Sequence, residues 1–160
     1  MTIKVGDRIP QATLATLTAD GPVRVGTDTL FAGRTVAVFA VPGAFTPTCS
    51  AKHLPGFIEN AEEIKKRGVD EIMCVAVNDA FVMGAWGESA GANDKVTMVA
   101  DGNGDFAAAL GLSMDASNYG LGTRSQRYSM LVKDGVVTAL NIEDPGAFNV
   151  SSAEHLLTQI

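Results

Sequence analysis

Cys49 lies in surroundings that favour nucleophilic chemistry. The apolar run 36–41 and a loop rich in Pro, Gly and Thr precede it, and a helical pattern of apolar residues follows it. Ligands of α/β proteins bind at the carboxyl ends of strands, and the first turn of a helix offers unpaired N–H groups and partial positive charge. Both features stabilise a thiolate, which is the nucleophilic form of cysteine. The sequence therefore predicts that Cys49 is reactive.

A thiolate at neutral pH also needs a cationic partner. An ordinary cysteine has a pKa of about 8.5, so about 3% of it is ionised at pH 7. Lowering a thiol pKa to about 6 takes roughly 3.4 kcal/mol, whereas a helix terminus supplies at most about 2 kcal/mol. Arg127, which begins the apolar run 128–132, is the first candidate for the missing charge, and Arg124 on a Gly-rich loop is the second.

The segment from Pro42 to Cys49 resembles the P-x-x-x-T-x-x-C active-site motif of the peroxiredoxins. This motif is far more specific than a lone cysteine. Further strings are similar to the peroxiredoxin-5, or type II, subfamily and extend over nearly the whole chain: VPGAFTPTCS, VND, DGNG, ALGL and RYSMLVKDG. The resemblance implies an α/β protein with a thioredoxin-like fold, in which helices flank a mixed central sheet.

The resemblance also implies a thiol-dependent peroxidase that reduces hydrogen peroxide and small organic hydroperoxides. Cys49 would be the peroxidatic cysteine, which the peroxide oxidises to a sulfenic acid. Thr46 would hydrogen-bond the thiolate and the peroxide, and Pro42 would shield the site and shape the loop. Arg127 would stabilise the thiolate and polarise the peroxide. Such donors favour the transition state, because negative charge moves from sulfur onto the departing oxygen.

Two further positions of the loop, Gly43 and Phe45, are expected to contact the substrate. The family also implies a homodimer whose interface lies close to the active-site loop. Phe45 and the segment 80–86 are candidates for that interface, because aromatic residues are enriched in such contacts. The aromatic residues of this segment fit an ordinary core as well.

Cys74 is the only other cysteine, and it lies within the apolar run 71–77. We expect a buried small hydrophobe there; a second thiol that forms a disulfide with Cys49 is the alternative. No cysteine follows Cys74, although some members of the subfamily carry a resolving cysteine near the C-terminus. We therefore expect a one-Cys mechanism, with the sulfenic acid resolved by glutathione and glutaredoxin or by thioredoxin.

Two other functions compete with a peroxidase. A peroxide-sensing regulator would share the sulfenic acid chemistry but show little turnover. A cysteine hydrolase would pair Cys49 with His53, one helical turn later, but we expect His53 on a helix surface or facing a loop. The cysteines and histidines lack the spacing of a zinc site, and no cofactor is expected because sulfur itself takes the oxygen.

The composition narrows the class of protein. The 160 residues carry a net charge of −6, which argues against a nucleic-acid partner. No apolar run approaches the roughly 20 residues of a membrane span. The start of the sequence does not resemble a signal peptide, and two cysteines are too few for a secreted disulfide scaffold, so we expect a cytoplasmic protein.

Hydrophobic periodicity predicts one thioredoxin-like domain over residues 1–160. Strands over 36–41, 71–77 and 96–100 alternate with a helix over about 54–66 and another over 79–90. Pro55 should kink the first helix, and Asn78 should cap the second.

The ends of the chain add antiparallel elements to this pattern. Residues 11–25 predict a short hairpin, and Phe106 begins a short helix. A second hairpin turns at Asp134-Gly135. A Ser-x-x-Glu capping box that begins at Ser151 starts the C-terminal helix.

Overall fold

A seven-stranded mixed sheet forms the centre of the molecule in the computed structural model, which describes residues 1–92 and 94–160. The strand order is β2-β1-β5-β4-β3-β8-β9. The strands are β1 (Thr13–Thr18), β2 (Gly21–Gly26), β3 (Thr35–Ala40), β4 (Glu71–Ala76), β5 (Thr97–Ala100), β8 (Tyr128–Lys133) and β9 (Val136–Ile142). Strands β3, β4 and β5 run parallel, and the remaining pairings are antiparallel. This topology confirms the predicted mixed α/β sheet.

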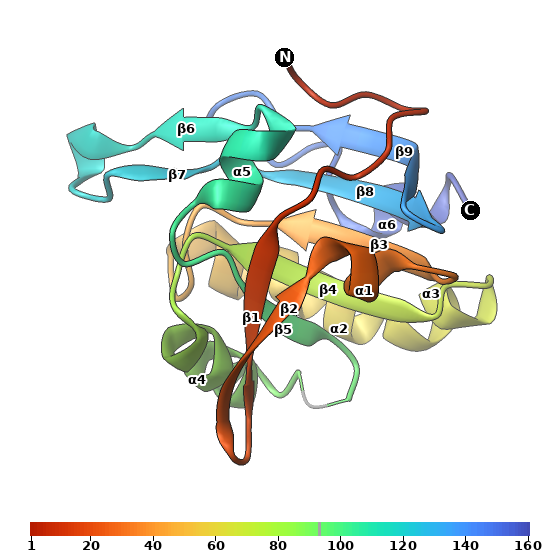
Figure 1. The fold of residues 1–160 in the computed structure, drawn as a ribbon, viewed down its shortest axis with the longest axis horizontal. Coiled ribbons are helices and arrows are strands. Elements are labelled where there is room, and N and C mark those ends of the chain that lie inside the picture. The colour runs from red at the N-terminus through yellow and green to blue at the C-terminus, as the bar shows by residue number, and fades with distance from the viewer. Residues whose placement is uncertain (93) are drawn as a thin grey trace.

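Helices cover both faces of this sheet (Figure 1). One face carries α2 (Leu54–Glu59), α3 (Ala61–Lys66), α4 (Ala80–Ala90) and α6 (Ala153–Leu157), whereas α1 (Thr27–Phe31) and α5 (Asp105–Leu110) lie on the other. Residues of β3 therefore face a core on either side, and Val36 to Ala40 are completely buried. This explains the continuous apolar run, because a strand buried on both faces has no polar side.

Two predicted hairpins are present at the edges of the sheet. β1 and β2 form the first. β8 and β9 form the second around Asp134 and Gly135, whose φ angles of 48° and 79° suit this residue pair. A third pair was not predicted: β6 (Ser113–Asp115) and β7 (Thr123–Ser125) form a separate two-stranded sheet that projects from the body. The short helix η2 (Ser117–Tyr119) joins these two strands.

The helical segment after Cys49 differs from the predicted kinked helix. A π-helical turn, η1 (Cys49–His53), comes first, and α2 then carries Pro55 in its first turn. Pro is tolerated there because the missing N–H has no helical partner in any case. The wide turn closes with a bond from the Leu54 N–H to the Cys49 carbonyl. The break between α2 and α3 falls at Asn60 instead.

Two predicted helix caps are wrong by one residue. Asp79, not Asn78, caps α4 and accepts a hydrogen bond from the Val82 N–H at 2.9 Å. Ser152, not Ser151, caps α6. Asn78 and Ser151 have other hydrogen-bond partners, both close to Cys49, as described below. Because the side chains of Asn78 and Ser151 are engaged in these tertiary hydrogen bonds, the next residue along the chain caps the helix in each case.

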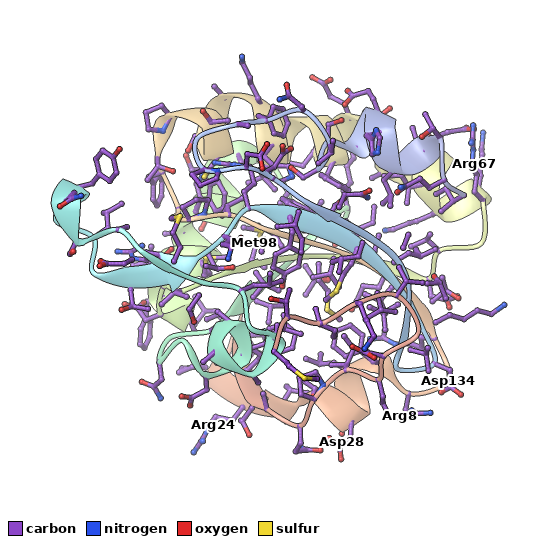
Figure 2. All side chains as sticks on the ribbon, turned by 90° about the horizontal axis from the view of Figure 1, so that it is seen from above. Arg8, Arg24, Asp28, Arg67, Met98 and Asp134 are labelled. Atoms are coloured by element: carbon purple, nitrogen blue, oxygen red, sulfur yellow. The ribbon has the colours of Figure 1, made fainter. Side chains whose placement is uncertain are left out.

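Glycines allow α4 to pack closely on the sheet. A Cβ on Gly87 would lie 2.5 Å from Cγ of Met98 on β5, whose side chain is labelled in Figure 2. A Cβ on Gly84 would collide with Leu17 of β1. These contacts account for two glycines inside a helix, where glycine otherwise costs about 1 kcal/mol. Within the described ranges, the helices are too short or too polar to cross a membrane.

Candidate active site

Cys49 lies in the first helical turn after β3. The loop 41–46 follows β3, and helical backbone begins at residue 47. The Ser50 N–H donates to the Thr46 carbonyl at 2.9 Å, and the N–H groups before it in a first turn have no carbonyl partner within the helix. The Cys49 side chain has no exposed surface. The predicted position at the carboxyl end of a strand is therefore correct, but the sulfur is more enclosed than its loop setting indicated.

Arg127 supplies a cation next to this sulfur. It precedes β8, and the antiparallel pairing of Tyr128 with Ala40 brings it to the end of β3. Its Nη2 donates to Cys49 Sγ at 3.0 Å, and its Nη1 donates to His53 Nδ1 at 2.8 Å. A guanidinium can fix two partners at once because its donors form a rigid fork. The structure thus brings Arg127 and Cys49 together.

His53 is buried, so the expected position on a helix surface is wrong, but the alternative of a loop-facing side chain is correct, because the ring contacts the loop residue Ser151. Its Nε2–H donates to the backbone carbonyl of Ser151 at 2.8 Å, which leaves Nδ1 as the acceptor for Arg127. Burial and, next, the charge of Arg127 lower the pKa of His53 to about 3. The imidazole is therefore neutral, and it holds the guanidinium without neutralising its charge.

The same arrangement argues against a cysteine hydrolase. The lone pair that would have to take a proton from a nucleophile is at Nδ1, and Arg127 donates to that atom. A general base must reach the proton it removes. His53 thus acts on the guanidinium rather than on the thiol.

Aromatic rings enclose the imidazole on several sides. The ring centroid of Phe39 lies 4.8 Å from that of His53, and the centroid of Phe148 lies 4.9 Å away. Phe148 also approaches the guanidinium carbon of Arg127, with 5.8 Å from that carbon to the ring centroid. A cation near a ring face is stabilised by the ring quadrupole. These contacts exclude water from one side of the Arg127–His53 pair.

Hydrogen bonds fix the loop before Cys49. The Thr46 hydroxyl donates to the Gly43 carbonyl at 2.7 Å, and Asn78 Oδ1 accepts from the Ala44 N–H at 2.9 Å. Thr46 therefore directs its proton into the loop, and its oxygen lone pairs are the groups left to meet a substrate. Phe45 adopts a φ of 64° and is 54% exposed. Its ring lies 6.3 Å from that of Trp86, between centroids.

Arg124 supports this loop instead of the sulfur. Its Nη1 donates to the Pro42 carbonyl at 3.3 Å, and its Nε donates to the Leu121 carbonyl at 2.9 Å. A Cβ on Gly43 would lie 3.1 Å from Arg124 Nη1 and 3.2 Å from Thr46 Cγ2. Glycine at this position permits the close approach of both side chains.

Cys74 is buried in the middle of β4, opposite Phe39 of β3 in the parallel register. Burial and, next, the nearby Cys49 raise the pKa of the Cys74 thiol well above its usual range. Both cysteines are free. Cys74 is thus a neutral thiol inside a paired strand.

A cleft of about 600 Å³ opens beside the site. Pro42, Thr48 and Arg127 are among the residues that line it. Its walls come from the β6–β7 segment, including Met114 and Leu121, and from the turn 143–147. Arg127 thus lines the cleft, and its Nη2 lies 3.0 Å from the buried sulfur.

Sequence reasoning missed Asn78 as part of this site and considered His53 only as the partner of Cys49 in a hydrolase. A signal existed for Asn78, because it follows directly after a buried strand, where α/β proteins place functional groups. His53 gave a weaker signal, since its partners Arg127 and Ser151 are distant in the chain.

Arg127 Nη2 lies 3.0 Å from the sulfur of the buried Cys49, which follows the carboxyl end of β3, an inner strand of a thioredoxin-like sheet. This fold and site define a thiol-based redox protein. The sequence matches the Redoxin family over residues 4–157. It is 56% identical over 161 residues to the chloroplastic peroxiredoxin-2E-2 of Oryza sativa subsp. japonica, covering 98% of this chain and 72% of the relative. It is 49% identical over 156 residues to peroxiredoxin-2B of Arabidopsis thaliana, covering 97% of this chain and 96% of the relative.

The fold agrees with these relatives. The reduced peroxiredoxin Prx3 of Vibrio vulnificus, solved in complex with hydrogen peroxide, superimposes with a TM-score of 0.95 at 52% identity and covers 99% of both chains. The chain belongs to the peroxiredoxin family, as its sequence motifs predicted. It is a thiol peroxidase with a thioredoxin-like fold.

Proposed function

We propose that this peroxidase reduces hydrogen peroxide and small organic hydroperoxides through a sulfenic acid on Cys49, which a thiol outside the chain then resolves. The 3.0 Å contact between Arg127 Nη2 and Cys49 Sγ carries this proposal. Hydrogen bonds from a charged donor to an anion are about twice as strong as neutral ones. A guanidinium at this distance therefore favours the thiolate and meets any oxygen that approaches it.

In the first step, the Cys49 thiolate attacks one peroxide oxygen. The S–O bond forms while the O–O bond breaks, so sulfur is oxidised and the peroxide is reduced. The departing oxygen takes up a proton and leaves as water or an alcohol. Arg127 and the Thr46 hydroxyl oxygen are proposed to hold the two peroxide oxygens along this axis, where charge develops.

The rest of the loop is proposed to shape the substrate site. Pro42 lines the cleft and would shield the sulfur from bulk water. Gly43 gives the peroxide room because it has no side chain. Phe45 would form an apolar border to the site, consistent with its exposed ring.

In the second step, an external thiolate attacks the sulfenic sulfur. A mixed disulfide forms and the sulfenic oxygen leaves as water; a second thiol then releases Cys49. The buried position of Cys74 inside β4 supports this one-Cys route, since a disulfide from it would require the strand to open. Glutathione with glutaredoxin, or thioredoxin, is the proposed reductant.

Peroxide turnover with both reductants in parallel tests this proposal. We expect sustained turnover with at least one of them, loss of activity in Cys49→Ser, and near-normal activity in Cys74→Ser. Mass spectrometry of the peroxide-treated protein with glutathione should find one glutathione on Cys49. A Cys49–Cys74 disulfide as the main product would contradict the one-Cys route. One turnover without continued consumption would favour a sensor.

We also propose that the chain forms a homodimer through the face that carries Phe45 and Phe81. These rings are 54% and 62% exposed, and exposed aromatic patches are typical of interfaces. Phe81→Ser should lower the mass measured by analytical ultracentrifugation. Val23→Ser, which changes another exposed apolar residue (45% exposed) on β2, is the control. A monomeric mass of the unaltered protein at high concentration would refute the dimer.

The proposed location is the cytoplasm, where free thiols stay reduced. The relative peroxiredoxin-2E-2 is named as chloroplastic. Fractionation of the source cells, followed by immunodetection, would distinguish a cytoplasmic location from an organellar one.

A further inference from the structure

Glu143 is a buried carboxylate that has no role in the reaction steps proposed above. Its side chain is 5% exposed, and one oxygen, Oε2, accepts four hydrogen bonds. The backbone N–H groups of Asn149, Val150 and Ser151 donate at 2.8 Å each, and the Ser151 hydroxyl donates at 2.7 Å. Burying a charge is costly unless it is hydrogen-bonded, and these four donors offset that cost at Oε2.

Glu143 lies directly beside Arg127, the residue that precedes β8. Glu143 follows β9, and its N–H donates to the Arg127 carbonyl at 3.0 Å, which extends the β8–β9 pairing by one residue. The chain then leaves through the turn 144–147 and returns to the carboxylate at 149–151. Glu143 thus closes a loop that begins and ends at the active site.

This loop delivers two groups to the arginine and its partner. The Ser151 carbonyl accepts from His53 Nε2 at 2.8 Å, and the Phe148 ring lies against both His53 and Arg127. His53 in turn accepts from Arg127, whose other nitrogen donates to Cys49. A continuous series of contacts therefore joins the carboxylate to the sulfur.

We propose that Glu143 is a positioning residue for peroxide reduction: it folds the loop 143–151 so that Ser151 and Phe148 hold His53, and His53 holds the Arg127 guanidinium against Cys49. This inference rests on the proposed role of Arg127. Acting through a neutral imidazole has a physical advantage over a direct Glu–Arg ion pair. The carboxylate fixes the geometry, while the guanidinium keeps its charge for the sulfur and the peroxide.

The test is Glu143→Gln, which keeps the size of the side chain but places a weaker, neutral acceptor in the loop. The rate constant for hydrogen peroxide with the reduced protein should fall about tenfold, which corresponds to ~1.4 kcal/mol. Glu154→Gln, an exposed glutamate on α6, is the matched control and should keep the full rate. Thermal unfolding of each variant must show that it is folded at the assay temperature.

A double-mutant cycle with His53→Gln separates positioning from general loss of structure. If Glu143 acts through His53, the double variant should lose little more activity than His53→Gln alone. Fully additive losses, or an unchanged rate in Glu143→Gln, would overturn the proposal. If Glu143→Gln does not fold, Ser151→Ala removes one donor alone; it should slow the reaction, and an unchanged rate would overturn the proposal. Absence of turnover in the unaltered protein would refute the proposed function instead.

Discussion

Arg127 Nη1 donates to His53 Nδ1 at 2.8 Å, and Arg127 Nη2 donates to Cys49 Sγ at 3.0 Å. The guanidinium therefore lies between the imidazole and the sulfur. The acceptor is neutral, because burial and the charge of Arg127 lower the pKa of His53 to about 3. A carboxylate in the same place would offset the positive charge that the thiolate needs. His53 therefore orients the Arg127 guanidinium toward the sulfur without reducing its positive charge.

The first prediction concerns the fork geometry of Arg127. Arg127→Lys should lower the rate constant for hydrogen peroxide about 10²- to 10³-fold, as for loss of one preorganised transition-state donor. A lysine keeps the charge but cannot bind His53 and Cys49 in one plane. Stopped-flow measurement on the reduced protein provides the rate.

The control for this prediction is Arg24→Lys, whose exposed side chain is labelled in Figure 2 and lies on β2, an edge strand separated from β3 by β1, β5 and β4. It should react like the unaltered protein. An Arg127→Lys rate within about twofold of the unaltered protein would mean that charge alone, and not the fork, supports the reaction.

The second prediction concerns pH and His53. Its pKa is about 6.5 in the unfolded chain and about 3 in the folded protein. Between these values the unfolded state binds more protons, so the free energy of unfolding should fall as pH drops below about 6.5. One proton changes the slope by at most about 1.4 kcal/mol per pH unit.

Urea unfolding at several pH values between about 5 and 7 measures this slope, because most carboxylates titrate below that range. His53→Gln should flatten the slope in this window, because it removes the imidazole whose pKa is lowered in the folded protein. Equal slopes for His53→Gln and the unaltered protein would show that His53 is not the group responsible.

Hydrophobic periodicity was enough to locate the main sheet. β3 and β4 are buried on both faces beyond their first residues, and β5 is buried at Val99 and Ala100; each gave a largely apolar run between turn residues. β6 and β7 have three residues each and are largely exposed, so they carry no periodic signal. The π-helical turn at Cys49 was equally invisible, since its apolar spacing matches that of an α-helix over so few residues.

The site was predictable where sequence neighbours define it and not where tertiary contacts do. Cys49 and its loop are contiguous, and Arg127 was found because a charge at the start of a buried strand needs a partner. Asn78 was assigned to a helix cap because Asn is a good capping residue. In the structure its Oδ1 is used by the Ala44 N–H, a contact across 34 positions of the chain.

The third prediction compares two glycines with the same backbone conformation. Gly111 and Gly120 both have a φ of 73°, in which an alanine costs about 1–2 kcal/mol. A Cβ on Gly120 would meet nothing, but a Cβ on Gly111 would collide with the backbone of Met1 and Thr2. Overpacking adds roughly 1–3 kcal/mol. Urea unfolding should therefore show a clearly larger loss for Gly111→Ala than for Gly120→Ala; equal losses would mean that the N-terminal segment moves away freely.

The last prediction concerns the tether between β4 and the active-site loop. Asn78→Ala removes the acceptor of the Ala44 N–H, so the free energy of unfolding should fall by about 0.5–1.5 kcal/mol. Because the loop before Cys49 loses this hydrogen bond, the rate constant for peroxide should fall several-fold. Asn78→Asp restores an oxygen acceptor and should recover most of the stability. Peroxide kinetics and urea unfolding of both variants provide the comparison. The tether would have no role in the reaction if Asn78→Ala lost stability but reacted with peroxide at the full rate.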